Sequence, residues 1–241
     1  MSSEALDEAV HDLVAANRIL GNEQILDAYG HVSVRHPGDP ERFLSSRARS
    51  PENVEAGDLL EHDLENNVVG DDGAIPYVDR FIHAAVYAAR ADVNAVCHNH
   101  ALSIHPFSVS RCTRLQATVN ASRLFGVGVP VWDIGDEFGE GTDVLVRSIA
   151  QGRSLARVLG AGTVALIRGY GSVVASPSVR EVVRACLDMD RGARAQVDLL
   201  ALGGAVGFSE TELAPHRSLP DGSGADERDW EYLLARAEVE G

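Results

Sequence analysis

The sequence predicts a mixed α/β domain, in which helices flank a sheet whose strands are joined partly by hairpins. Long stretches of the chain repeat apolar residues with helical spacing, and short apolar runs between them are bounded by turn-forming residues. The chain has 241 residues, of which 45% are hydrophobic. It is therefore long enough for one such domain with a substantial core.

The N-terminal part begins with a helix and continues as strands joined by turns. Apolar residues at helical spacing predict a helix over residues 4–20, and Gly21 is expected to end it. The elements expected next are strands over 29–35 and 43–46 with a turn over 36–40 between them, a helical turn over 51–54, and a hairpin flanked by 59–60 and 68–69.

The rest of the chain alternates helices with buried strands. Helices are expected over residues 77–90, 143–159 and 178–202, and buried strands over residues 93–100 and 163–167. Glu181 follows Ser178 by three residues, which indicates a capping box at the start of the last of these helices. Residues 215–229 are rich in turn formers and are expected to be a loop. We expect one domain over 1–205 and a tail over 206–241 that packs at a subunit interface.

Charge and cysteine content limit the possible partners and compartments. A net charge of −15 without a basic stripe argues against a nucleic-acid-binding protein. No apolar run is long enough to span a bilayer, and the first residues lack the pattern of a signal peptide, so a cytoplasmic protein without a membrane partner is expected. Three cysteines without C-x-x-C spacing indicate reduced thiols.

Two absences in the sequence exclude classes of chemistry. All 21 basic residues other than histidine are arginine, so no lysine is present to form a Schiff base with a carbonyl substrate or with pyridoxal phosphate. The chain also lacks a G-x-G-x-x-G phosphate-binding signature, and we expect no NAD. Carbon–carbon chemistry in this protein must therefore stabilise a carbanion with a metal ion or with fixed hydrogen-bond donors.

His98-Asn99-His100 is the most informative motif of the chain. It ends an apolar strand, and histidines at positions i and i+2 of a strand point to the same side. Two adjacent imidazoles form half of a transition-metal site, and Asp79, at the start of the preceding helix, could complete a facial site with open positions. The alternatives are an inert, hydrogen-bonded histidine pair and an aspartate that only favours the helix dipole.

Several segments resemble the class II aldolase/adducin family, in the order in which that family carries them. They are residues 29–35, 43–47, 79–83, 95–100 and 164–171, and the resemblance extends over residues 8–205. The resemblance implies a three-layer α/β/α fold with a central mixed, mostly antiparallel sheet. It also implies a homotetramer with active sites at subunit interfaces.

The same resemblance implies a divalent metal site with two departures from the family pattern. His98 and His100 match two metal ligands, and Asp79 occupies the position of an acid that is usually glutamate and acts as base or transient ligand. The family's third histidine ligand is replaced by Tyr170 within Arg168-Gly169-Tyr170-Gly171. Zn, Mn, Co or Fe is the expected ion if the site is retained, and Tyr170 is otherwise expected to act as a neutral hydrogen-bond donor.

The motifs around residues 29–51 are similar to the decarboxylase branch of the family rather than to its sugar-phosphate aldolases. A small-molecule carboxylate is therefore the expected substrate, and an arginine fork would match it bidentately. The expected substrate-binding residues are Tyr29, Gly30, Ser45, Arg47 and Arg114. His31 is a candidate for proton transfer, and His83 is expected to be a structural helix histidine.

The favoured function is a carbon–carbon lyase of decarboxylase or aldolase type. It would act on a small hydroxy, keto or aromatic carboxylate through a metal-stabilised enolate or carbanion, with Asp79 or Tyr170 returning the proton. One alternative is a metal-independent enzyme that uses Tyr170 and His31 for cyclisation, isomerisation or a retro-aldol reaction. Further alternatives are an Fe(II)-dependent oxygenase and a non-catalytic, adducin-like interaction domain.

Overall fold

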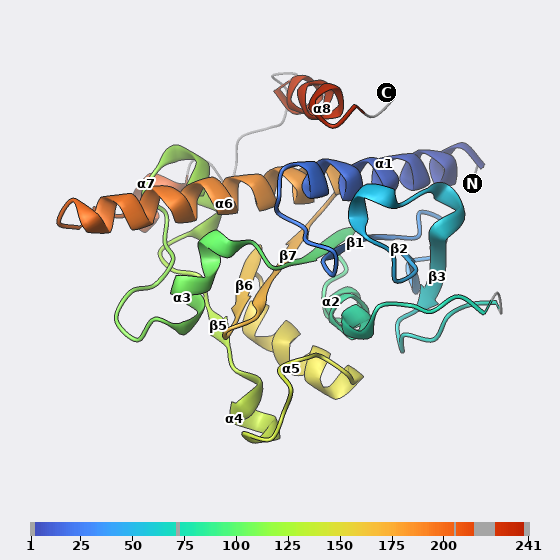
Figure 1. The fold of residues 1–241 in the computed structure, drawn as a ribbon, viewed down its shortest axis with the longest axis horizontal. Coiled ribbons are helices and arrows are strands. Elements are labelled where there is room, and N and C mark those ends of the chain that lie inside the picture. The colour runs from blue at the N-terminus through green and yellow to red at the C-terminus, as the bar shows by residue number, and fades with distance from the viewer. Residues whose placement is uncertain (1–2, 71–72, 205, 215–224, 239–241) are drawn as a thin grey trace.

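The sheet of this protein is the middle layer of three (Figure 1). The structure is a computed structural model, and it describes residues 3–70, 73–204, 206–214 and 225–238. The strands are β1 (His31–Arg35), β2 (Arg42–Ser46), β3 (Leu59–Asp63), β4 (Ala95–Asn99), β5 (Val131–Trp132), β6 (Val164–Ile167) and β7 (Gly171–Ser176). They form one seven-stranded sheet in the order β3-β2-β1-β4-β7-β6-β5. All neighbouring strands pair antiparallel except β5 and β6, which are parallel, so the expected mixed, mostly antiparallel sheet is confirmed.

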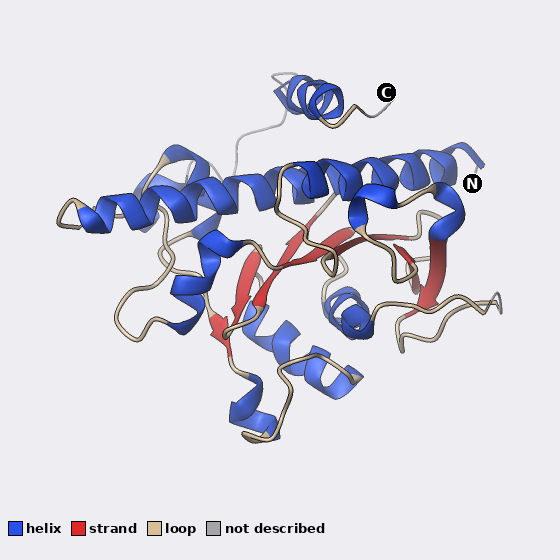
Figure 2. Ribbon diagram, viewed as in Figure 1, coloured by secondary structure: helices blue, strands red, loops and turns tan. Residues whose placement is uncertain are grey.

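Helices cover both faces of the sheet (Figure 2). The helices are α1 (Ser3–Asn22), α2 (Phe81–Ala89), α3 (His105–Val109), α4 (Ile134–Phe138), α5 (Ile149–Leu159), α6 (Val179–Ala201), α7 (Glu210–Leu213) and α8 (Ala225–Arg236). The long helices α1 and α6 share one apolar core with alternate strand residues, and α2 and α5 share the other. Gly152 of α5 allows the second pair to pack closely, because an added Cβ would lie 2.9 Å from the Cβ of Ala85 in α2.

Two local expectations were wrong at element boundaries, and one strand was not predicted. The helix expected from residue 143 begins at Ile149, because the Ser148 side chain accepts from the N–H of Gln151 and caps it there. Helix α1 continues through Gly21 to Asn22. Glu52 packs closely against Gly21, since an added Cβ would lie 2.8 Å from Cγ of Glu52. Strand β7 had not been predicted.

The C-terminal tail contributes to the core that α1 and α6 form. Its helix α8 includes residues 225–229, which were expected to be loop, whereas residues 215–224 of that expected loop lie outside the described residues. Trp230, Leu233 and Leu234 of α8 are buried in the same apolar cluster as α1 and α6. No helix within the described ranges combines the length and the apolarity that a membrane crossing requires.

Candidate active site

The two histidines of the H-x-H motif belong to β4, the middle strand, and to the residue that follows it. Side chains alternate along β4, so Val96 and His98 face the layer of α2 and α5, whereas Cys97 lies in the core formed with α1 and α6. The expectation that Cys97 points away from the histidine pair is therefore confirmed. His98 is fully buried, and the side chain of His100 is 10% exposed.

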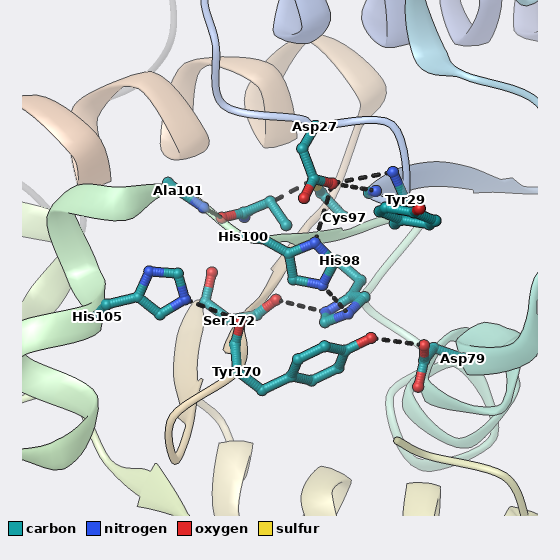
Figure 3. Close-up of polar contacts among 12 residues, drawn as sticks. Asp27, Tyr29, Asp79, Cys97, His98, His100, Ala101, His105, Tyr170 and Ser172 are labelled. Carbon is teal, nitrogen blue, oxygen red and sulfur yellow. Dashed lines mark hydrogen bonds and ion pairs between the residues drawn. The ribbon is translucent and has the colours of Figure 1, made fainter. Parts of the chain in front are cut away.

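The Nε2 atoms of His98 and His100 lie 3.1 Å apart, and each ring is held through its other nitrogen (Figure 3). Nδ1 of His98 donates to the carbonyl oxygen of Ser172 at 3.0 Å, and Nδ1 of His100 donates to Oδ1 of Asp27 at 3.0 Å. Burial lowers the pKa of His98 to about 3, so this ring is neutral and its proton resides on Nδ1. When His100 is neutral with its proton on Nδ1 toward Asp27, both Nε2 atoms present lone pairs to the same point, where a cation would stabilise them.

This donor set fits a divalent transition metal. Zinc, cobalt, manganese and iron bind neutral imidazole nitrogen, and a hydrogen-bond acceptor on the opposite ring nitrogen is the usual support of a metal-binding histidine. Within the described ranges, no three His, Cys, Asp or Glu side chains gather as a group that could hold an ion. His98 and His100 would thus supply two ligands, and the other positions would be open to a bound molecule or to neighbouring oxygen atoms.

Tyr170 and Asp79 lie beside the histidine pair and are hydrogen-bonded to each other (Figure 3). The tyrosine ring centroid is 5.2 Å from that of His98 and 4.7 Å from that of His100. The Tyr170 hydroxyl donates to Oδ2 of Asp79 at 2.8 Å, and Oδ1 of Asp79 accepts from the N–H of Val146 at 2.6 Å.

The environments of these two groups favour their protonated forms. Burial raises the pKa of Asp79, although the hydrogen bonds from Val146 and Tyr170 work in the opposite direction. Burial and the adjacent Asp79 carboxyl raise the pKa of Tyr170 well above its usual value. Tyr170 is therefore a neutral donor at physiological pH, and Asp79 is a carboxyl group suited to exchange a proton with it.

Asp27 is a residue of the site that the sequence analysis missed. Its Oδ1 accepts from the N–H groups of Tyr29 and Gly30, each at 2.9 Å, in addition to His100. Burial opposes ionisation of Asp27, but the hydrogen bonds from His100 and the two amides lower its pKa overall. A side chain at Gly30 would be crowded, since an added Cβ would lie 2.7 Å from Cδ2 of Leu26 and 3.2 Å from the carbonyl oxygen of His98. An aspartate three residues before a glycine does indicate a turn, which is a local signal that could have drawn attention to Asp27.

His31 joins the same face of the sheet from β1. It pairs directly with His98 in the antiparallel ladder, and the two ring centroids are 5.5 Å apart. Its ring also packs against Tyr77, with the centroids 4.3 Å apart, and its Nδ1 lies 2.7 Å from Nε2 of His83. His83 is fully buried and hydrogen-bonded beneath the strand, in agreement with the structural role expected for it.

The predicted substrate-binding residues near the histidines differ in exposure. Tyr29 is 73% exposed and lies beside Asp27 at the edge of the site (Figure 3). Ser45 is buried, and its Oγ lies 3.2 Å from Nε2 of His62. Tyr29 and Gly30 therefore border the histidine pair, whereas the hydroxyl of Ser45 is directed to another imidazole.

Of the two arginines predicted to bind a carboxylate, the Arg47 guanidinium binds another partner in this structure, and Arg114 is held through its backbone carbonyl. Nε of Arg47 donates to Oδ1 of the buried Asp58 at 2.7 Å, and Arg49 binds the other oxygen of that carboxylate at 2.7 Å. The carbonyl oxygen of Arg114 accepts from the side chain of Gln196 in α6. Among the described contacts, none joins Arg47 or Arg114 to the histidine pair, so their substrate-binding roles stay predictions.

Comparisons with known proteins agree on fold and family. The sequence pattern of the Class II Aldolase and Adducin N-terminal domain matches residues 11–197. The chain is 28% identical over 222 residues to Decarboxylase tropJ of Talaromyces stipitatus, covering 87% of this chain and 82% of the relative. It is 27% identical over 247 residues to a 3,4-dihydroxyphthalate decarboxylase of Arthrobacter keyseri, covering 93% and 92%. A crystal structure of an aldolase II superfamily protein from Pseudomonas syringae superposes with a TM-score of 0.80 at 23% identity, covering 99% of this chain and 94% of that one.

Proposed function

This chain belongs to the class II aldolase and adducin family, and from that premise we propose that it is a decarboxylase that acts on a small aromatic or hydroxy carboxylate. The observation that carries the proposal is the position of the Tyr170–Asp79 pair against the two imidazoles whose Nε2 atoms converge. Decarboxylation requires an electron acceptor for the carbanion and a proton donor for the same carbon. The converging imidazoles support the first requirement, and the hydroxyl–carboxyl pair supports the second.

The residues of the chain have separate roles in this scheme. His98 and His100 would hold a divalent ion, which when bound supplies the Lewis acidity that stabilises the developing negative charge. Asp27 and the carbonyl of Ser172 keep the two rings oriented with Nε2 toward the substrate. The Tyr170 hydroxyl donates its proton to the carbanion carbon, and Asp79 takes a proton from solvent water and passes it to the phenolic oxygen.

The substrate class follows from the relatives and from the aromatic lining of the site. Two of the relatives are named as 3,4-dihydroxyphthalate decarboxylases. The partly exposed ring of Tyr170, beside His98 and His100, provides a flat surface against which an aromatic acid could stack. Arg47 and Arg114 stay candidates for binding the carboxylate that is retained. By resemblance to the family, we also propose a homotetramer that works in the cytoplasm.

A metal-independent acid–base enzyme is the second candidate function. It is favoured by the replacement of the third histidine with Tyr170 and by the absence of a three-residue His, Cys, Asp or Glu cluster within the described ranges. In that case Tyr170 and Asp79 would carry out proton transfer without a Lewis acid.

The test combines metal analysis with release of CO₂. Wild type and a His98→Ala/His100→Ala variant would be analysed by plasma mass spectrometry and assayed with 3,4-dihydroxyphthalate and related dihydroxybenzoates. His36→Ala is the matched control, because His36 is a partly exposed histidine outside the site. We expect bound metal and chelator-sensitive CO₂ release in wild type and in the control only. Chelator-insensitive CO₂ release would favour the second candidate, and metal-loaded protein without CO₂ release from any aromatic acid would overturn the decarboxylase proposal.

A further inference from the structure

A buried chain of hydrogen bonds extends from His31 along the sheet-facing side of helix α2 to Tyr87. Nδ1 of His31 lies 2.7 Å from Nε2 of His83, and Nδ1 of His83 lies 2.5 Å from Oγ of Ser33. Oγ of Ser33 lies in turn 2.8 Å from the hydroxyl of Tyr87. The four side chains are almost completely buried, with exposed fractions of 0–2%. Water therefore does not supply alternative partners for Oγ of Ser33, for the ring of His83 or for Nδ1 of His31, which all lie inside this network.

The direction in which these hydrogen bonds are donated follows from Tyr87. The proton of its buried hydroxyl needs a hydrogen-bond acceptor. Among the described residues, the acceptor in contact with that proton is Oγ of Ser33. Ser33 must then direct its single proton to Nδ1 of His83, because a buried hydroxyl without an acceptor is costly.

The same direction of donation continues through the two imidazoles. His83 and His31 are buried, and among the described contacts neither ring meets a carboxylate, so both rings are neutral and each carries one proton. Nδ1 of His83 accepts from Ser33, so its proton lies on Nε2 and is donated to Nδ1 of His31. The proton of His31 must therefore lie on Nε2.

We propose that the chain Tyr87–Ser33–His83 fixes His31 in the Nε2–H tautomer, which makes His31 a hydrogen-bond donor toward the substrate and not a third metal ligand. His98 and His100 have the opposite tautomer, because a carbonyl and a carboxylate accept from their Nδ1 atoms. Nε2 of His31 has no hydrogen-bond partner within the part of the chain that the structure describes. His31 lies opposite His98 on the face that carries the site, so its N–H is available to an anionic oxygen of a bound molecule.

This inference deepens the proposed function and rests on it for the role of the donated hydrogen bond. A substrate carboxylate or phenolate oxygen is the acceptor that such a neutral donor would bind. His83 and Ser33 are positioning residues in this arrangement, since neither touches the substrate and each acts by setting the tautomer of His31. The tautomer itself is a property of the protein alone, so it can be measured without substrate.

The experiment is ¹⁵N–¹H correlation spectroscopy of histidine-labelled protein, which separates protonated from unprotonated ring nitrogens. The signals of His31 are assigned by their loss in His31→Gln. In wild type we expect a protonated Nε2 and an unprotonated Nδ1 for His31, and the reverse for His98. Tyr87→Phe and Ser33→Ala each remove a hydroxyl that sets the direction of hydrogen-bond donation along the network. The two ring-nitrogen chemical shifts of His31 should then move toward each other.

The control is Ser154→Ala, which removes a buried hydroxyl that accepts from the Trp132 indole; among the described hydrogen bonds, none joins it to Tyr87, Ser33, His83 or His31. It should leave the His31 shifts unchanged. A wild-type His31 with its proton on Nδ1 overturns the inference even if every variant fails to fold. Shifts that stay the same in both Tyr87→Phe and Ser33→Ala overturn it as well. A failure of the proposed function is a separate result, since it is measured by CO₂ release and metal content.

Discussion

Replacing Tyr170 by phenylalanine should destabilise the metal-free protein by an amount that depends on pH. The substitution removes one hydroxyl, which donates to the buried carboxyl of Asp79 at 2.8 Å. A hydrogen bond to a charged group contributes about 1.5–3 kcal/mol, whereas one between neutral groups contributes about 0.5–1.5 kcal/mol. The difference of about 1–1.5 kcal/mol corresponds to a further rise of about one unit in the pKa of Asp79.

The direction of the pH dependence follows from the raised pKa of Asp79. Burial raises this pKa above the ordinary value of 3.8, so the unfolded chain ionises more readily than the folded one. Such a carboxyl contributes most to stability below pH 3.8, and that contribution is lost as the pH rises through the folded-state pKa. We expect Tyr170→Phe to lose about 1.5–3 kcal/mol at neutral pH but only about 0.5–1.5 kcal/mol below pH 3.8.

Urea unfolding in the presence of a chelator, followed by circular dichroism at both pH values, measures this difference. Tyr87→Phe is the matched control, because its hydroxyl is buried and contacts Ser33 and a backbone amide but no carboxylate. Its loss of stability should be the same at the two pH values. Equal losses for Tyr170→Phe at both pH values, or full stability at neutral pH, would refute the reasoning.

Two further substitutions test the support of the histidine pair. Asp27→Asn should weaken zinc binding about 10- to 100-fold in a competition titration, because an amide holds Nδ1 of His100 less firmly than a carboxylate does. Unchanged affinity would show that Asp27 does not orient the ring. Gly171→Ala should cost about 2–4 kcal/mol in chemical denaturation, since its Cβ would meet the carbonyl oxygen of Asn99 and lie 2.9 Å from Cδ2 of His100. Gly57→Ala, where the added Cβ meets nothing within 4 Å, is its control and should change stability little.

Features that depend on local periodicity could be predicted from the sequence. The period of two in β4 is a property of any extended strand, so the common face of His98 and His100 and the opposite face of Cys97 followed directly. The α/β class followed in the same way from helical and strand periodicities. Strand β7 was missed because only Val173, Val174 and Ala175 form its apolar run, which is too short to predict a strand alone.

Features that depend on packing between distant segments could not be predicted. Asp27 and His100 are 73 residues apart, and Asp79 and Tyr170 are 91 residues apart. Asp79 and Tyr170 were both candidates, but their hydrogen bond depends on how the start of α2 approaches the turn between β6 and β7. Arg47 was expected to bind a substrate carboxylate, but its guanidinium forms an ion pair with Asp58, which the sequence analysis did not foresee.

The place of β4 in the sheet determines how ligand binding would affect the whole molecule. Three strands lie on each side of β4, so its amides are expected to exchange with solvent only when the entire sheet opens. An ion that binds the folded histidine pair and not the unfolded chain would therefore slow exchange of those amides of the sheet that exchange only through global opening. By mass action, a free ion concentration one hundred times the dissociation constant would add about 2.7 kcal/mol to the free energy of global opening.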